Sequence, residues 1–268
     1  MAVGEPPSPS ELAAMLEAAR EATRIAGQEL LRHLGQPQTV TSKGLRDIVT
    51  EADLISEGLI LEHIRTRFPS HRILSEESWP NLQEWGEETC WAVDPLDGTS
   101  NYARGGPLFS ISVAALRGGR PLVGAVHEPI RGQTFSASLG GGAFLNGLPL
   151  RVSKVQRPLS AMVAFDWGRD QRDRLKVLAL IQRIGPKVGT LRTWGSAALG
   201  LCYVAAGWTD AYFHVALNLW DVAAGVLLVR EAGGRVTQWD GRPWNAQARS
   251  VLASNGWLQE ILTAHLGD

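Results

Sequence analysis

The segment 91–99 carries two carboxylates at the end of a short apolar run, separated by a proline and a leucine. Asp94 and Asp97 offer hard oxygen donors, and Mg²⁺ is typically held by one or two carboxylates while it keeps positions for water and phosphate. Because the proline and Gly98 bend the chain, the Leu96 carbonyl can face the same ion, and the free amides after Gly98 can receive an anion. The pattern favours a magnesium site beside a phosphate pocket, although an ordinary Asp-Gly turn would also account for it.

Two further acidic elements occur at places that suit the same site. Glu76 and Glu77 follow a short strand expected at 72–74, and adjacent carboxylates repel each other unless a cation or water screens them. Asp221 precedes an apolar helical stretch that ends in two glycines. A solvated loop end and a helix N-cap are the plainer interpretations, and an N-cap Asp can still present an oxygen to a metal. Together with Asp94, these residues favour one metal centre built from separate parts of the chain.

In their order and separations, these acidic elements resemble the inositol monophosphatase family, a superfamily of Mg²⁺-dependent, often lithium-sensitive sugar- and nucleotide-phosphate phosphatases. The resemblance extends from about Gly27 to about Ser250, and its ordered motifs make chance agreement implausible. The segments that carry it are Asp47 to Asp53, Glu76-Glu77, Asp94 to Tyr102, Gly142 to Gly147, Gly195 to Ala198 and Trp220 to Gly225.

The resemblance implies a site that binds two Mg²⁺ ions, with a third and weaker ion near Glu76. The expected ligands are Glu76, Asp94 and the Leu96 carbonyl for the first ion, and Asp94, Asp97 and Asp221 for the second. The other implied site residues are the catalytic Asp47, Glu76 and Thr99, and the phosphate- and substrate-binding Gly98, Thr99, Ser100, Ser196, Ala197, His214 and Asp221.

Activation of the nucleophile is expected to involve Thr99, which would orient the attacking water. Asp47 is expected to hydrogen-bond Thr99 and make it a better acceptor; alternatively, Asp47 is a loop carboxylate that caps the helix starting at Glu51. Thr50 and Asp53 have capping-box spacing and are expected to be structural. No Ser-His-Asp or Cys-His nucleophile pattern is readable, so direct attack by water is favoured over a covalent intermediate.

His214 departs from the family pattern. Relatives that hydrolyse inositol phosphate have a glutamate seven residues before the second-signature aspartate, which is Asp221 here. The change removes an anionic acceptor for polyol hydroxyls, because neutral imidazole offers one donor and one acceptor. The alternative is a histidine that only satisfies a local hydrogen bond at a strand end. If His214 faces the substrate, the case for plain inositol phosphate is weaker.

Hydrophobic periodicity divides the chain into two halves. From Trp91 to Arg151 alternating apolar residues and glycine pairs predict a largely antiparallel sheet, and after Pro158 strands alternate with helices. The predicted fold is an α+β half over 1–155 followed by a mixed α/β half over 156–268, and the resemblance implies an αβαβα sandwich with the site between the halves. Helices are expected at 8–33, 51–68, 172–184, 196–206, 221–231 and 256–266, and short strands at 72–74, 162–165, 187–191, 211–215, 235–238 and 250–253.

Composition is typical of a compact enzyme. The 268 residues carry a net charge of −1 with both signs interspersed, which argues against nucleic-acid binding and against a polybasic membrane surface. No apolar run approaches the roughly 20 residues that cross a bilayer. Met1 to Ser10 is typical of a loose tail and not of a signal peptide, and Cys90 and Cys202 give no disulfide framework. Cytoplasm is the default location, and the resemblance favours a homodimer.

Three functions are consistent with these observations. The leading hypothesis is Mg²⁺-dependent hydrolysis of a small sugar or polyol phosphate monoester, similar to inositol 1-phosphate, by metal-activated water. The second is a phosphatase of fructose 1,6-bisphosphate or of 3′-phosphoadenosine 5′-phosphate. The third is a regulatory partner-binding protein that keeps the fold, since some bacterial relatives are linked to transcription complexes. The carboxylates argue against a purely non-catalytic role.

Overall fold

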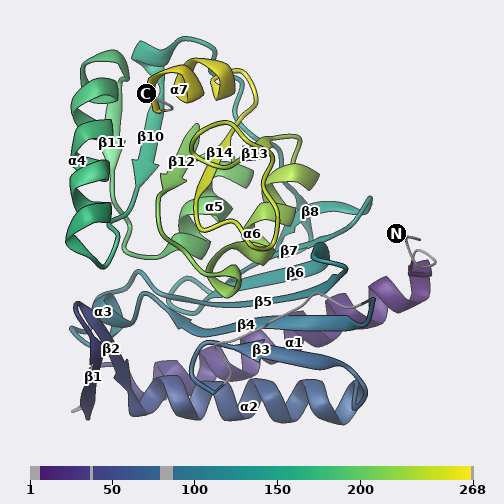
Figure 1. The fold of residues 1–268 in the computed structure, drawn as a ribbon. Coiled ribbons are helices and arrows are strands. Elements are labelled where there is room, and N and C mark those ends of the chain that lie inside the picture. The colour runs from purple at the N-terminus through teal and green to yellow at the C-terminus, as the bar shows by residue number, and fades with distance from the viewer. Residues whose placement is uncertain (1–6, 37–38, 79–86, 267–268) are drawn as a thin grey trace.

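The computed structural model describes residues 7–36, 39–78 and 87–266, which form five stacked layers of helices and sheets (Figure 1). Helices α1 (Pro9–His33) and α2 (Glu51–Arg67) cover the outer face of the first sheet. Helices α5 (Ala197–Ala205) and α6 (Leu219–Glu231) lie between the two sheets, and α4 (Gln171–Ile184) and α7 (Gln259–Leu266) pack together at the far side of the second sheet. The arrangement is the predicted αβαβα sandwich.

The first sheet has seven strands in chain order and is antiparallel except for its first pair. Its strands are β3 (Arg72–Ser75), β4 (Thr89–Asp97), β5 (Ser110–Arg117), β6 (Arg120–Glu128), β7 (Gln133–Ser138), β8 (Gly142–Leu145) and β9 (Leu148–Pro149). Only β3 and β4 run parallel, with Ser75 opposite Val93. Parallel strands end at the same edge of a sheet, so the residues that follow β3 and those that close β4 lie together.

The second sheet has five strands and is mixed. Their order is β11 (Thr190–Arg192), β10 (Met162–Phe165), β12 (Ala211–His214), β14 (Val251–Ser254) and β13 (Arg235–Thr237). Strand β10 pairs in parallel with both neighbours, whereas β14 is antiparallel to β12 and β13. This confirms the predicted change from a largely antiparallel half to a mixed α/β half. The division at residue 155 stays a prediction.

Close packing of α6 on the first sheet fixes the position of Asp221 in the first turn of that helix. A Cβ on Gly124 of β6 would lie 2.7 Å from the Ala224 Cα, and a Cβ on Gly225 would lie 2.5 Å from the Leu201 side chain of α5. Small residues therefore let α6 approach both the sheet and α5. Helix α6 is buried almost all round, as expected for a helix that is apolar on every side.

Most predicted elements are observed within a few residues of their expected bounds. The strand predicted at 187–191 is wrong at its start, because Gly185–Lys187 forms a 3₁₀ helix (η2) and β11 begins only at Thr190. Not predicted were the hairpin of β1 (Val40–Gly44) and β2 (Asp47–Thr50), the short helix α3 (Thr99–Tyr102) and the 3₁₀ turn η1 (Pro158–Ser160). Residues 1–6 of the expected loose tail lie outside the described residues, and Ser8 caps α1. Within the described ranges no helix is both long and apolar enough to cross a membrane.

Candidate active site

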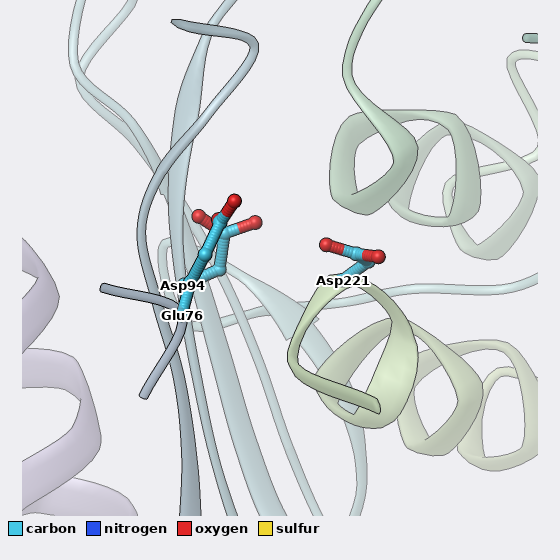
Figure 2. A group of neighbouring side chains, drawn as sticks. All are labelled: Glu76, Asp94 and Asp221. Carbon is cyan, nitrogen blue, oxygen red and sulfur yellow. The ribbon is translucent and has the colours of Figure 1, made fainter. Parts of the chain in front are cut away.

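Three carboxylates from three elements meet at the edge of the first sheet. One carboxylate oxygen each from Glu76, Asp94 and Asp221 lies within 4.8 Å of the others. Figure 2 shows Glu76 and Asp94 side by side and facing Asp221, which projects from the start of α6. Glu76 is held there because its N–H donates to the Val93 carbonyl at 3.2 Å, which extends the parallel pairing of β3 and β4.

The carboxylates are buried among like charges. Asp94 is only 1% exposed, and burial raises its pKa well above the usual range, with Glu76, Asp97 and Asp221 adding to the effect. Burial likewise raises the pKa of Asp221 to about 8, and Glu76 contributes. Like charges that are brought together in a low dielectric disfavour ionisation unless a cation lies between them. The cluster therefore fits a hard divalent cation, whose preferred ligands are carboxylate oxygens.

Two basic side chains reach the rim of this cluster, and sequence analysis did not single out either of them. Lys43 Nζ, on the β1–β2 hairpin, lies 3.1 Å from Glu76 Oε1 and 2.7 Å from Glu77 Oε1. Arg169 Nη2 lies 3.5 Å from the same Glu76 oxygen. Burial alone would lower the pKa of Lys43, but Glu76 and Glu77 raise it. The Glu76 carboxylate thus attracts cations from two separate segments, and Glu77 is the ion-pair partner of Lys43.

Asp221 does not cap α6 as predicted. The N-cap is Asn218, and Asp221 is the third helical residue, whose Oδ2 accepts from the Asn218 N–H at 2.6 Å. This is the acidic half of a capping box, which turns the carboxylate back toward the start of the helix. The start of α6 and the carboxylate cluster therefore share one side chain.

Asp97 joins the first sheet to α5. Its carboxylate accepts from the Ser196 hydroxyl, from the Ala197 N–H at 3.2 Å and from the Ala198 N–H at 2.8 Å. Burial raises the pKa of Asp97 to about 6 although these hydrogen bonds lower it. Asp97 thus lies outside the group of three and holds the N-terminus of α5 in place, and its role as a metal ligand stays a prediction.

The predicted contact between Asp47 and Thr99 is wrong. Thr99 Oγ1 lies 3.1 Å from Asp53 Oδ1 and 3.0 Å from the Leu96 carbonyl oxygen, whereas Asp47 Oδ2 accepts from Arg169 Nη1 at 2.7 Å. Asp47 opens β2 on the hairpin, while Asp53 lies in the first turn of α2, directly beside α3. Sequence analysis assigned Asp53 a structural role only, and the structure gives it a second contact.

The two carboxylate oxygens of Asp53 have different hydrogen-bond partners. Oδ2 accepts from the Thr50 N–H at 2.8 Å and from the Thr50 hydroxyl at 2.6 Å, which confirms the predicted capping box. Oδ1 is left to accept from Thr99. The side chain is 1% exposed, and burial raises its pKa. The capping spacing was the available signal, but it does not show where the second oxygen points.

A cavity of about 420 Å³ lies over these groups. It is bordered by all the predicted metal, phosphate and substrate residues: Asp47, Glu76, Asp94, Leu96, Asp97, Gly98, Thr99, Ser100, Ser196, Ala197, His214 and Asp221. Gly98 has a φ of 93°, and a Cβ there would lie 2.9 Å from the Leu108 carbonyl oxygen. The turn after β4 therefore requires glycine at this position. Asp53 was not among the predicted site residues, and it reaches the cavity through Thr99.

His214 borders the cavity but offers no free acceptor. Its Nδ1 accepts from the Ala216 N–H at 3.0 Å, and the ring also hydrogen-bonds the Trp167 backbone. Burial lowers the pKa of His214 to about 4, so the ring is neutral near pH 7. The hydrogen bonds agree with the alternative of a locally satisfied histidine at a strand end, and a contact of His214 with substrate stays a prediction.

The layered sandwich and the carboxylate cluster agree with a family of phosphomonoesterases that use divalent metals. The sequence model of the inositol monophosphatase family matches residues 11–267, and the chain belongs to this family. It is 40% identical over 261 residues to inositol monophosphatase 2 of Solanum lycopersicum, covering 94% of this chain and 98% of the relative. It is 41% identical over 253 residues to the Nus factor SuhB of Pasteurella multocida, covering 92% and 94%. The crystal structure of the extragenic suppressor protein suhB from Bartonella henselae superposes with a TM-score of 0.89 at 33% identity, covering 94% of this chain and 98% of that one.

Proposed function

We propose that this protein hydrolyses small sugar or polyol phosphate monoesters, of which inositol 1-phosphate is the reference, in a reaction that requires Mg²⁺. The observation that carries the proposal is the cluster of Glu76, Asp94 and Asp221 beneath an open cavity. Relatives named inositol monophosphatase support the choice of substrate class.

The donor set fits Mg²⁺. Three carboxylates from separate elements converge without a nitrogen or sulfur ligand among them, and the Lys43 and Arg169 contacts show that Glu76 attracts positive charge. In the proposal Glu76, Asp94 and the Leu96 carbonyl hold one ion, and Asp94, Asp97 and Asp221 hold a second. When bound, such ions neutralise the phosphate, lower the pKa of a bound water and stabilise the leaving oxygen.

Thr99 and Asp53 are the groups of this chain placed to orient the attacking water. A hydroxyl has one proton and two acceptor lone pairs. Since Thr99 Oγ1 lies within 3.1 Å of both Asp53 Oδ1 and the Leu96 carbonyl oxygen, its O–H donates a hydrogen bond to one of them. The Thr99 oxygen can then accept a hydrogen bond from water and orient it. Asp53 therefore takes the positioning role that sequence analysis gave to Asp47.

The phosphate is proposed to bind at the turn after β4. Gly98, Thr99 and Ser100 border the cavity, and successive backbone amides of a turn can together bind an anion. Ser196 and Ala197 lie across the cavity, where Asp97 holds them. These residues fix the phosphate end of the substrate, so its leaving group must extend toward the segment around Trp167 and His214, which border the same cavity.

Phosphate release from a panel of monoesters tests the proposal. With Mg²⁺, inositol 1-phosphate and related sugar phosphates are expected to be hydrolysed, and EDTA should abolish the activity until Mg²⁺ is added back. A folded preparation that releases phosphate from no member of the panel would contradict the proposal. In that case a binding role, to which the SuhB relatives give a precedent, would take its place. Cytoplasmic location and a homodimer stay predictions.

A further inference from the structure

The buried face of helix α2 is polar where it is nearest to the carboxylate cluster. Ser56 and Glu57 lie three and four residues after Asp53, so the three side chains share one face of the helix. Their exposed fractions are 1% for Asp53, 0% for Ser56 and 6% for Glu57. Further along the same face the helix buries Ile60 and Ile64, as an amphipathic helix usually does. Buried polar groups need hydrogen-bond partners, and those of α2 lie in the segments that carry the proposed metal ligands.

Glu57 holds the turn that carries the two glutamates after β3. Its Oε1 accepts from the Ser75 hydroxyl at 2.5 Å and from the Ser78 N–H at 3.1 Å. Ser75 directly precedes Glu76, and Ser78 directly follows Glu77. One carboxylate oxygen of α2 therefore contacts both ends of the turn from which Glu76 reaches the cluster.

Ser56 holds the backbone between Asp94 and Leu96. The pairing of β4 with β5 is irregular between Asp94 and Asp97, so the regular ladder that fixes the rest of β4 is interrupted here. Within this irregular stretch the Ser56 hydroxyl donates to the Pro95 carbonyl oxygen at 2.7 Å. The bond thus fixes the chain between the Asp94 carboxylate and the Leu96 carbonyl, which are two of the proposed ligands.

The two contacts place Glu76 and Asp94 on one support. These two carboxylates lie side by side in the cluster (Figure 2). Each belongs to backbone at or beyond the end of the regular pairing of β3 with β4, which closes at Ser75 and Val93. Because neighbouring residues of one helix turn hold both segments, the separation of the two ligands is set by a rigid element and not by a loop.

We infer that Glu57 and Ser56 are positioning residues, which hold Glu76 and Asp94 at the separation that a divalent cation requires. The inference rests on the proposed function, because it needs the carboxylate cluster to bind Mg²⁺. Groups that orient metal ligands contribute to affinity without touching the ion, and their loss typically costs about 10–100-fold in metal binding. Glu57 acts through the oxygen that accepts two hydrogen bonds, so an uncharged side chain with the same acceptor should replace it.

Binding of Mg²⁺ to the free protein, measured by calorimetric titration without substrate, tests the inference apart from catalysis. Glu57→Met keeps the length of the side chain but removes the acceptor. Glu57→Gln removes the charge and keeps an acceptor oxygen for Ser75 and Ser78. Ser75→Ala removes one of the two donors from the other side of the contact.

Ser56→Ala removes the donor to the Pro95 carbonyl and tests the second contact. Ser254→Ala is its matched control. Ser254 of β14 is also fully buried, and its hydroxyl donates to Gln259 Oε1 at 2.7 Å, in the second sheet and away from the carboxylate cluster. Both variants lose a buried hydroxyl, so urea unfolding curves should show a loss of stability in each, whereas Mg²⁺ affinity should fall only in Ser56→Ala.

Glu57→Met is expected to weaken Mg²⁺ binding about 10–100-fold, and Glu57→Gln to stay within a few-fold of wild type. Ser56→Ala and Ser75→Ala should each weaken binding severalfold. The double variant E57M/S75A should bind Mg²⁺ no more weakly than Glu57→Met alone, because both changes remove the same contact. The Mg²⁺ concentration for half-maximal phosphate release should rise by the same factors.

Three outcomes overturn the inference in different ways. If Glu57→Gln weakens binding as much as Glu57→Met, the charge of Glu57 matters and its hydrogen bonds do not. If Ser56→Ala and Ser75→Ala are folded and bind Mg²⁺ like the wild type, the contacts only stabilise the fold, while the proposed function stands. If the folded wild type neither binds Mg²⁺ nor releases phosphate from inositol 1-phosphate, the proposed function fails and the inference fails with it.

Discussion

Exchange of Asp53 for asparagine tests whether Asp53, and not Asp47 as sequence analysis expected, supports Thr99. Three donors converge on the Asp53 carboxylate: the Thr50 N–H and hydroxyl on Oδ2, and the Thr99 hydroxyl on Oδ1. Asparagine has one acceptor oxygen, so it can serve Oδ1 or Oδ2 but not both. Either the helix cap is lost, or Thr99 faces the asparagine NH₂ and no longer has the carboxylate as its acceptor.

The substitution is expected to lower both the stability of the protein and the rate of hydrolysis. Loss of the cap costs about 1 kcal/mol, and a buried donor left unpaired costs about 1–3 kcal/mol. Loss of the Thr99 contact weakens positioning of the attacking water, and groups that assist proton transfer typically contribute about 10²–10⁴-fold to the rate. We therefore expect Asp53→Asn to lower kcat at least about 10²-fold.

Asp47→Asn is the matched control, since it removes the same charge six residues away. Its partner Arg169 is half exposed, and exposed ion pairs contribute about 0–1 kcal/mol, so kcat should stay within a few-fold of wild type. Initial rates on inositol 1-phosphate at saturating Mg²⁺, with urea unfolding curves to confirm that each variant is folded, decide the matter. A larger loss of kcat in Asp47→Asn than in Asp53→Asn would refute the reasoning from the structure.

Four further outcomes are expected. Asp94→Asn should lower hydrolysis about 10²–10³-fold, and a rate within tenfold of wild type with unchanged Mg²⁺ dependence would remove Asp94 from the metal centre. Li⁺ should inhibit uncompetitively. If Li⁺ leaves the hydrolysis rate unchanged at concentrations at which Na⁺ and K⁺ also have no effect, the result would count against a product-release site like that of the family. Lys43→Gln should strengthen Mg²⁺ binding in calorimetric titrations without substrate, because Glu76 loses a competing cation; weaker binding would show that Lys43 supports the site. Burial lowers the pKa of His127 to about 4, whereas a histidine of the unfolded chain takes up a proton near pH 6.5, so His127 should make the protein about 1–2 kcal/mol less stable at pH 5 than at pH 8. If the urea midpoint falls between pH 8 and pH 5 by the same amount in the wild type and in His127→Gln, this expectation is contradicted.

The parts of the site that sequence predicted lie at the ends of strands and helices. Asp94 lies near the end of β4, Glu76 directly follows β3, and Asp221 lies in the first turn of α6, so turn and apolar patterns were enough to place them. The aspartate that contacts Thr99 could not be chosen in this way. Asp47 and Asp53 both flank the same short strand, and only the position of α2 against α3 decides which one reaches a residue 46 positions along the chain.

The basic groups around the site escaped prediction for a similar reason. Lys43 meets Glu76 across 33 residues, and Arg169 meets Asp47 across 122 residues. Single lysines and arginines on loops have no periodicity to mark them, and their partners are set by packing between layers. The β1–β2 hairpin was missed because all five residues of β1 are exposed, so no alternation of apolar and polar residues marks the strand.

The three carboxylates proposed to bind metal come from both sides of the interface between the first sheet and α6, so an ion bound there would link the two layers. Glu76 and Asp94 belong to the sheet, whereas Asp221 belongs to a helix that also packs against the second sheet. Without an ion, burial and mutual repulsion disfavour ionisation of these carboxyl groups; with one, the charged carboxylates would all attract the same cation and hold the layers together. A ligand that binds only the native state stabilises it by RT ln(1 + [L]/Kd), about 2.7 kcal/mol at a hundredfold excess over Kd. Mg²⁺ bound at the proposed site would thus raise the melting temperature of the protein, and hydrogen exchange at the first turn of α6 should slow as the Mg²⁺ concentration rises.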